Sequence, residues 1–353
     1  MSDKIILKAE HITKKFPAAG GRTLTACSDI SLSVYQGETL GIVGESGCGK
    51  STFVKMLVNI LKPTQGQILF EGEDITKYKG EKLRKLRPKI QMVFQDPSAA
   101  FHPKMKVMDI VTEPLMNFGK INRSQKEEKA KELLRLVELP EEYVYRFPHN
   151  MSGGQRQRVG IARALALEPE IIVCDEATSA LDVSVQDHII ELLVKLQKEK
   201  GISFVFICHD VALVQSFAHQ VAVMYLGNVV EVLPGSQVRH HAVHPYTQAL
   251  LGAIFSTRMD FTKEIKSIES EAPSPLDVPQ GCPFQNRCDR CMEICRTKKP
   301  EMVNVGPKHQ AACHLFNEHG KGAEDENIQH TIGVSVYNQE KEEMSMFMND
   351  LRV

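Results

Sequence analysis

The sequence lacks three features that would place it in other classes of protein: a long apolar run, an excess of charge of one sign, and a secretory signal. No apolar run approaches the ~20 residues that a membrane-spanning helix requires, so any passage through a membrane must be made by other chains. The 43 basic and 44 acidic residues give a net charge of −1, which provides no broad basic field for nucleic acid. The first residues, 1–4, do not open a secretory signal. We therefore expect a cytoplasmic chain that does not bind nucleic acid, with room in its 353 residues for one sizeable core and an appendage.

A phosphate-binding loop is predicted between a short apolar strand at 39–43 and a helix at 51–61. The loop matches the pattern G-x-x-x-x-G-K-[ST] through Gly44, Glu45, Ser46, Gly47, Cys48, Gly49, Lys50 and Ser51, with Thr52 next in the chain. Glycine permits the tight turns that point successive backbone N–H groups at phosphate oxygens. We expect Lys50 to reach the β- and γ-phosphates of a nucleotide and the Ser51 hydroxyl to bind Mg²⁺.

A second apolar strand, predicted at 170–175, ends in two adjacent carboxylates. Asp175 and Glu176 stand at the carboxyl end of this strand, where nucleotide sites form in open α/β sheets. We expect Asp175 to hold Mg²⁺, directly or through water, and Glu176 to polarise the attacking water as a general base. The alternative, an acidic helix N-terminus favoured by the helix dipole, leaves the relation to Lys50 unexplained.

Just upstream of the acidic strand, residues 150–155 read Asn-Met-Ser-Gly-Gly-Gln. Ser152, Gly153, Gly154 and Gln155 are expected to open a helix that runs to Leu167 and to offer backbone N–H groups as an anion site. The order of phosphate loop, Ser-Gly-Gly-Gln element and acidic strand end, over roughly residues 5–255, resembles the ATP-binding-cassette (ABC) ATPases. In that family this element closes over the ATP held by a partner subunit, so the resemblance implies a dimer of two cassettes around two nucleotides.

The resemblance implies further site residues. Gln95 matches the glutamine loop that senses Mg²⁺ and γ-phosphate, and His209, at the end of an apolar strand at 202–208, matches the switch histidine. Ser179 and Asp182 match the loop that crosses the dimer interface. Phe16 is the candidate for stacking on adenine, with a buried strand residue as the alternative. The metal ligands implied for Mg²⁺ are Ser51 and Gln95.

Nine cysteines are present, and five of them cluster near the C-terminus: Cys282, Cys288, Cys291, Cys295 and Cys313. Thiolates at this density favour zinc or an iron–sulfur cluster. The surrounding residues resemble the C-terminal extension of oligopeptide/dipeptide permease ATPases. That resemblance implies Cys282, Cys288, Cys295 and Cys313 as ligands of a [4Fe–4S] cluster, with Cys291 outside the pattern. Zinc and no metal remain the alternatives.

The expected fold is an α/β P-loop NTPase, an ABC cassette with a RecA-like core, an antiparallel β subdomain and a helical subdomain, followed by a small Cys-rich C-terminal extension. We expect the nucleotide-binding domain at 1–255 with its helical subdomain at about 96–165, the extension at 256–316, and an acidic tail at 317–353. The tail is interpreted as disordered or as a short docking segment. Within the helical subdomain, residues 124–127 resemble a capping box, and the segment with Phe101 and Pro103 is expected to dock on a membrane subunit.

The sequence therefore predicts the ATP-hydrolysing subunit of a peptide-type ABC importer at the cytoplasmic face of the membrane. Its implied partners are two transmembrane permease subunits, a second and related ABC ATPase, and an extracytoplasmic solute-binding protein. One alternative is a soluble ABC ATPase of DNA repair or translation, but no long insertion interrupts residues 96–165. A second is a non-enzymatic metal sensor, which the intact Lys50, Asp175, Glu176 and His209 disfavour. The cargo is not encoded in this chain.

Overall fold

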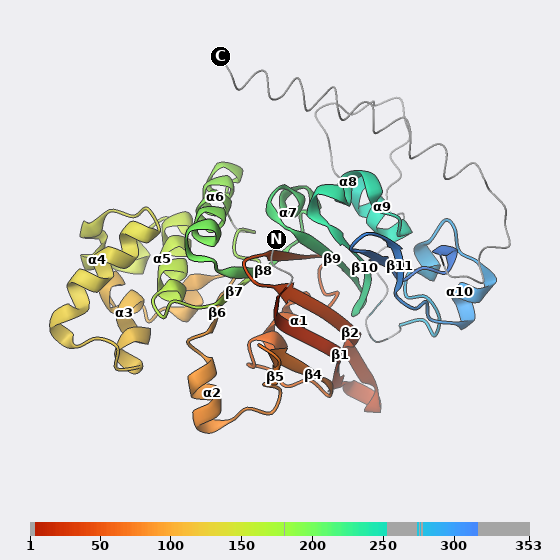
Figure 1. Cartoon of the computed structure of the whole chain (residues 1–353), viewed down its shortest axis with the longest axis horizontal. Coiled ribbons are helices and arrows are strands. Elements are labelled where there is room, and N and C mark those ends of the chain that lie inside the picture. Colours follow the sequence, from red (N-terminus) through yellow and green to blue (C-terminus); the bar gives the residue numbers. More distant parts are fainter. Residues whose placement is uncertain (1–3, 180, 253–273, 275, 277, 317–353) are drawn as a thin grey trace, which may run out of the picture. The chain divides into compact units, whose positions relative to one another are not determined.

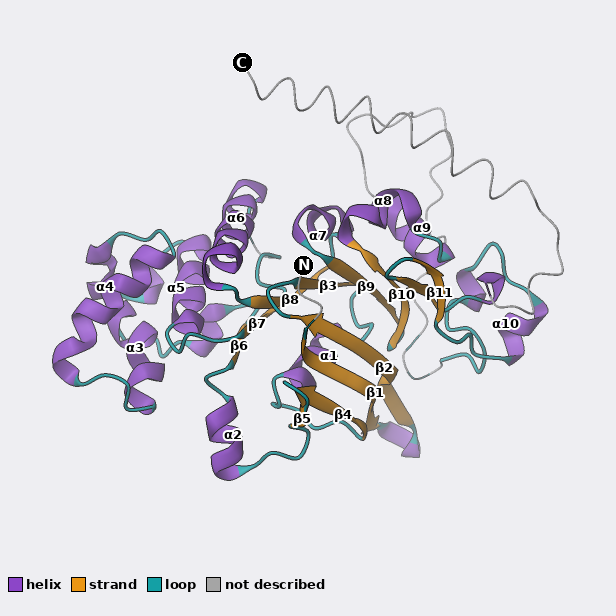
Figure 2. Ribbon diagram, in the orientation of Figure 1, coloured by secondary structure: helices purple, strands orange, loops and turns teal. Residues whose placement is uncertain are grey.

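Two β-sheets organise the part of the chain that the computed structural model describes, namely residues 4–179, 181–252, 274, 276 and 278–316 (Figures 1 and 2). The boundary predicted at 255/256 and the acidic tail at 317–353 lie outside the described residues, so the domain limits stay a prediction. No described helix combines the length and the apolar character needed to span a membrane.

The larger sheet carries the phosphate loop. Its strand order within the described residues is β11-β12-β10-β9-β3-β8-β7-β6. The strands are β3 (Thr39–Val43), β6 (Ile90–Val93), β7 (Ile171–Asp175), β8 (Ser203–Cys208), β9 (Gln220–Tyr225), β10 (Asn228–Pro234), β11 (Val303–Gly306) and β12 (His309–Ala311). Neighbouring strands from β6 to β9 run parallel, and those from β9 to β11 run antiparallel. Strands β3, β7 and β8 are buried along their whole length, which explains their continuous apolar sequences.

The smaller sheet is antiparallel, with strand order β2-β1-β4-β5. Its strands are β1 (Ile5–Pro17), β2 (Thr23–Tyr35), β4 (Gln65–Phe70) and β5 (Glu73–Asp74). Its buried residues share a hydrophobic cluster with helix α1 (Lys50–Leu57) and with one face of the larger sheet. The predicted β subdomain therefore packs next to the phosphate loop.

The remaining helices connect the strands. They are α2 (Gly80–Leu86), α3 (Val107–Asn117), α4 (Lys126–Leu136), α5 (Gly153–Leu165), α6 (Val183–Lys200), α7 (Val211–Phe217), α8 (Val238–His241), α9 (Pro245–Gly252) and α10 (Glu293–Thr297). Short 3-10 turns are η1 (Ala19–Gly21), η2 (Pro97–Ala100), η3 (Arg123–Gln125), η4 (Glu141–Tyr145), η5 (Pro148–Asn150), η6 (Gly235–Gln237), η7 (Gln285–Arg287) and η8 (His314–Phe316). Helices α3, α4 and α5 contact one another, and α5 contacts the edge strand β6 (Figure 2).

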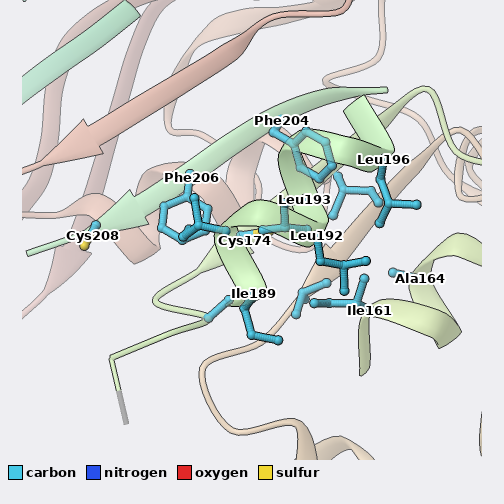
Figure 3. Packing of buried hydrophobic residues seen from close by; sticks show 14 of the residues in the cluster. Ile161, Ala164, Cys174, Ile189, Leu192, Leu193, Leu196, Phe204, Phe206 and Cys208 are labelled. Atoms are coloured by element: carbon cyan, nitrogen blue, oxygen red, sulfur yellow. The ribbon is translucent and has the colours of Figure 1, made fainter. Parts of the chain in front are cut away.

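Buried apolar side chains link these helices to the sheet (Figure 3). Ile161 of α5 and Leu192 of α6 belong to the same buried cluster as Cys174 of β7 and Phe206 of β8. Burying each large apolar side chain contributes roughly 1.5–3 kcal/mol. The helix that opens with the Ser-Gly-Gly-Gln element is therefore fixed to the strand that ends in Asp175.

Two local predictions need correction. The helix after the phosphate loop ends at Leu57, not Leu61, because Asn59 adopts a left-handed conformation (φ 58°) and donates a hydrogen bond to the carbonyl of Ile75. The capping box belongs to Asn122 and Gln125, which bond each other's backbone N–H groups, whereas Ser124 donates to the Asn122 side chain. A 3-10 turn precedes α4 and moves the cap two residues towards the N-terminus.

The interpretation of the clustered cysteines as a metal centre is wrong. Among the residues described, no group of three or more His, Cys, Asp or Glu side chains is placed to hold a metal ion. Cys282 and Cys295 instead lie in the hydrophobic core, where burial raises the pKa of the Cys282 thiol to about 12. Burial also raises the pKa of the Cys288 thiol.

Strand pairing joins the residues around these cysteines to the larger sheet. We call residues 278–313 the C-terminal segment. Its strand β12 pairs with β10 through Glu231 opposite Ala311 and Val232 opposite Gln310. The segment thereby continues the sheet that carries the phosphate loop, and a separate Cys-rich extension is not supported.

Candidate nucleotide site

A polar cleft of ≈ 440 Å³ opens beside the phosphate loop. Three regions of the chain line it: the strands β1 and β2, the loop with the start of α1, and the ends of the strands of the larger sheet. The lining residues are Phe16, Leu24, Thr25, Ala26, Ser46, Gly47, Gly49, Lys50, Ser51, Thr52, Gln95, Glu176 and Gly227. This volume lies within the range of small-molecule sites. The structure thus brings residues from distant parts of the sequence to one cleft, as expected for a nucleotide.

The phosphate loop needs glycine at two of its positions. Gly44 has φ 152° and Gly49 has φ 105°. A Cβ atom would lie 2.1 Å from the carbonyl oxygen of Met224 at position 44 and 2.1 Å from that of Ala26 at position 49. Both contacts are with backbone, so larger residues would displace the loop from its neighbouring strands.

Lys50 begins helix α1 and is buried. Its ammonium group donates to the carbonyl oxygens of Gly44 at 2.7 Å and Glu45 at 2.9 Å. These bonds satisfy a buried cation within the loop and hold its charge beside the backbone N–H groups that would receive phosphate. The two hydrogen bonds thus fix the orientation of the Lys50 side chain within the loop.

Ser51 and Asp175 meet at the carboxyl end of β7. The Ser51 hydroxyl donates to Asp175 Oδ1 at 2.8 Å. Burial raises the pKa of Asp175, while the Ser51 hydrogen bond and the charge of Lys55 lower it. A hydroxyl and a carboxylate oxygen are ligands that Mg²⁺ accepts, with its remaining positions left to water and phosphate. The donor set therefore fits Mg²⁺.

Glu176 and His209 are in contact at the same strand edge. Glu176 Oε1 lies 2.5 Å from His209 Nε2, and His209 Nδ1 lies 3.4 Å from the Lys50 ammonium. His209 Nδ1 also lies 3.3 Å from the carbonyl oxygen of Gly44, so the ring contacts both the base and the phosphate loop. Glu176 adopts φ 50°, a left-handed conformation that is uncommon for glutamate and that recurs at functional sites.

Gln95 and Ser179 connect two loops at the entrance of the cleft. The Gln95 amide donates to the Ser179 hydroxyl at 3.4 Å, and that hydroxyl donates to the carbonyl of Glu176 at 3.0 Å. The predicted glutamine loop, interface loop and general base are thereby joined by hydrogen bonds. Asp182 lies further along and is the N-cap residue of α6.

The residues of the Ser-Gly-Gly-Gln element, 152–155, lie outside the lining of this cleft. Ser152 is the N-cap of α5, its hydroxyl accepts from the Gln155 N–H at 3.3 Å, and Gln155 Oε1 accepts from the Ser152 N–H at 3.0 Å. Gly154 packs so closely on α6 that an added Cβ would lie 2.4 Å from Val185. The motif thus forms a rigid helix start, and the chain's own phosphate loop is not its partner.

Two residues expected in the ATP site have side chains directed elsewhere. Cys48 is buried, and burial raises the pKa of its thiol. The Glu45 carboxylate accepts two hydrogen bonds, both at 2.9 Å, from Arg287 of the C-terminal segment. Sequence reasoning missed Arg287, because only folding brings it to a loop 242 positions away.

A second hollow, of ≈ 300 Å³, lies between β6 and the helices α3 and α5. Its walls include the exposed apolar side chains of Ile60 and Phe94 and the charged groups of Arg87 and Arg163. Phe101, which the sequence suggested for docking, is buried in the core instead. Sequence reasoning did not single out Phe94 as a docking residue, although its position next to Gln95 could have indicated it.

Comparison with known proteins agrees with this geometry. The family model described as "ABC transporter" matches residues 27–179, and that described as "Oligopeptide/dipeptide transporter, C-terminal region" matches residues 230–295. The chain is 46% identical over 321 residues to a "Probable peptide ABC transporter ATP-binding protein" of Sinorhizobium fredii, covering 89% of this chain and 91% of the relative. It is 43% identical over 325 residues to the "Oligopeptide transport ATP-binding protein AppF" of Bacillus subtilis, covering 90% and 99%.

Solved structures place the fold in the same family. A dimeric cassette, MJ0796, bound to ADP and Pi matches with a TM-score of 0.60 and 32% identity, over 65% of this chain and 98% of that one. The cbiO1 protein of Clostridium perfringens, part of an ABC transporter complex, matches with a TM-score of 0.60 and 32% identity, over 67% and 91%. The predicted ABC cassette fold is confirmed, and the chain belongs to the ABC transporter family, within the ATP-binding proteins of oligopeptide/dipeptide transporters.

Proposed function

We propose that this chain is the ATP-hydrolysing subunit of an ABC importer for peptides. The observation that carries the proposal is the meeting of Lys50, Ser51, Asp175, Glu176 and His209 at one strand edge, with the distances given above. These groups supply a phosphate-binding cation, an Mg²⁺ site, a base and a γ-phosphate sensor. The alternative of a soluble ATPase of DNA repair or translation is not favoured, because relatives along most of the chain are oligopeptide transport proteins.

The residues act in a defined order in this proposal. The loop N–H groups and Lys50 bind the phosphates, and Phe16 stacks on the adenine. Mg²⁺ held by Ser51, with Asp175 and Gln95 nearby, would neutralise charge that develops on the phosphate oxygens. Glu176 then orients and polarises the attacking water, while His209 holds the carboxylate in place through their contact and senses the γ-phosphate.

The proposal also requires two cassettes. Ser152, Gly153, Gly154 and Gln155 present a helix start that does not line the chain's own cleft. The capping box uses the N–H groups of Ser152 and Gln155. Those of Gly153 and Gly154, at the helix start, remain for an anion, and we propose that they receive the γ-phosphate held by another subunit. The dimeric cassette structure cited above supports this arrangement. We propose that the second subunit is a related but different ATPase chain, and that Ser179 and Asp182 lie at the interface.

The second hollow is the proposed contact site for a membrane subunit. Its apolar wall at Ile60 and Phe94 and its cations at Arg87 and Arg163 suit a short amphipathic segment of a permease subunit. Phe94 directly precedes Gln95, so a segment seated there would respond to the state of the ATP site. We propose that the chain works at the cytoplasmic face of the membrane with two permeases and an extracytoplasmic peptide-binding protein.

Affinity purification of the tagged full-length chain from native membranes, followed by mass spectrometry, tests this function. We expect two permease subunits and a second cassette among the retained proteins. A matched tagged chain with Phe94→Asp should retain fewer permease molecules. Recovery of the wild-type chain with ribosomal or DNA-repair proteins in place of permeases would refute the importer function.

A further inference from the structure

The phosphate loop is contacted by a residue far along the chain. Arg287 of η7 reaches Glu45 with Nη1 to Oε2 at 2.9 Å and Nη2 to Oε1 at 2.9 Å. Two parallel bonds between guanidinium and carboxylate fix orientation as well as distance. The Arg287 side chain is 5% exposed, and Nη1 also donates to the Tyr225 hydroxyl at 3.2 Å. The Glu45 side chain is 25% exposed, so the arginine side of this ion pair is the better shielded from solvent screening.

Every polar group of Glu45 has a partner. Its N–H donates to the Tyr246 hydroxyl at 3.0 Å, and its carbonyl accepts from the Lys50 ammonium at 2.9 Å. Its carboxylate is held by Arg287. The same residue thus touches the cation that would bind phosphate and the C-terminal segment. A shift of Glu45 would be transmitted to Lys50 through one carbonyl.

The environment of the ion pair is aromatic and rigid. The rings of Tyr225, Tyr246 and Phe284 pack with centroid distances of 4.6, 5.3 and 5.4 Å, and all three side chains are buried. The guanidinium lies 5.6 Å from the centroid of the Tyr225 ring. Phe284 comes from the C-terminal segment, whereas the two tyrosines come from β9 and α9. The aromatic rings around Arg287 thus come from both the cassette and the C-terminal segment.

The C-terminal segment itself is anchored, so Arg287 cannot easily follow a moving loop. Strand β12 pairs with β10. His309 of β12 contacts the buried carboxylate of Glu231 at 2.8 Å, and Lys299 donates to the Ser28 hydroxyl at 3.2 Å. These contacts fix the position of Arg287, and the two hydrogen bonds to Glu45 carry that position to the glycine-rich loop.

We propose that Arg287 is a positioning residue for ATP binding, which holds the phosphate loop in its phosphate-binding conformation through Glu45. A second effect adds to the geometric one. Arg287 neutralises a carboxylate that would otherwise stand in the loop that receives the phosphates. Removing one partner of a buried ion pair also lowers stability, so the test measures nucleotide affinity on folded protein. The inference rests on the proposed ATP site but not on the transport function.

The test compares full-length variants in a binding assay and a hydrolysis assay. Binding of a fluorescent ATP analogue gives Kd, and steady-state hydrolysis of Mg·ATP separates KM from kcat. Arg287→Gln should raise Kd and KM on the order of 10- to 100-fold, the scale that misplacement of an active-site group by about 1 Å can produce. Arg287→Lys keeps the positive charge but loses the pair of parallel hydrogen bonds to Glu45. Its Kd and KM should lie between those of the wild type and those of Arg287→Gln.

The control variant is Arg296→Gln. Arg296 forms an exposed ion pair with Glu293 at 3.9 Å in the same C-terminal segment. Exposed pairs contribute little, so its Kd and KM should equal those of the wild type. A purely structural role of Arg287 would lower the active fraction, and hence the apparent kcat, without changing KM.

The double variant makes the proposal specific to the pair. In Glu45→Gln with Arg287→Gln no carboxylate is left without a counter-charge, so the double variant should bind ATP more tightly than Arg287→Gln alone. An unchanged Kd in Arg287→Gln, or losses in the two single variants that simply multiply in the double one, would overturn the proposal. If Arg287→Gln does not fold, Glu45→Gln and the double variant still decide it. Because the readout is ATP affinity, failure of Glu176 as the base would leave this result interpretable.

Discussion

Replacing Phe16 by alanine should weaken ATP binding while leaving the fold and the phosphate loop intact. Phe16 lies at the end of β1, opposite Leu24 of β2, and its half-buried ring lines the cleft beside the loop. The Lys14 ammonium lies 5.0 Å from the centroid of that ring. Loss of one base–aromatic stack costs about 1–3 kcal/mol. At about 1.4 kcal/mol for each factor of ten, Kd for ATP should rise roughly 5- to 140-fold.

Isothermal titration calorimetry with Mg·ATP and with tripolyphosphate separates the two halves of the site. Tripolyphosphate carries the phosphates without the base, so Phe16→Ala should bind it as the wild type does. Phe16→Tyr keeps the ring and should retain ATP affinity, whereas Phe16→Leu keeps apolar surface but loses the stack. Equal ATP affinity in Phe16→Leu and in the wild type would refute stacking and identify Phe16 as an ordinary strand residue.

Two further predictions concern stability and coupling. Burial holds the pKa of His244 at about 4, below its ordinary 6.5, so the unfolded chain binds more protons between these values. The free energy of unfolding should therefore fall by about 3 kcal/mol as pH drops from 6.5 to 4. In denaturant titrations, His244→Gln should lose less stability over this range than the wild type. The exposed control His240→Gln should lose as much as the wild type. For the second hollow, Phe94→Asp should weaken retention of permease subunits in pull-downs at unchanged ATP affinity. Val278→Asp, which alters an equally exposed side chain (37%) outside the hollow, is its control, and equal retention by both variants would contradict the docking site.

The parts of the site that the sequence predicted are those encoded in short stretches. The strand, glycine-rich loop and helix around Lys50 are neighbours in sequence, and the glycines are required by backbone geometry at Gly44 and Gly49. The carboxylates at the end of β7 follow from a buried strand, apolar from Ile171 to Cys174, that ends where the site forms. Local patterns carry such information because the chemistry and the backbone conformation are set by the same few residues.

What the sequence could not predict depends on tertiary packing. Cysteine spacing does not say whether sulfurs converge, and the structure buries Cys282 and Cys295 in the core without a metal-binding group among the residues described. The bond between Arg287 and Glu45 joins positions 242 apart. It follows from the pairing of β12 with β10, a contact of short strands with no strong sequence signal.

The measurement that tests the central claim most directly is single-turnover ATP hydrolysis by the assembled complex carrying Glu176→Gln in this chain. The substitution keeps the shape of the side chain at the contact with His209 but removes the basic carboxylate. The account predicts that ATP still binds, while hydrolysis at this site slows by on the order of 10²–10⁴-fold. Hydrolysis at this site at the wild-type rate would contradict the account, because Glu176 would then not be the base.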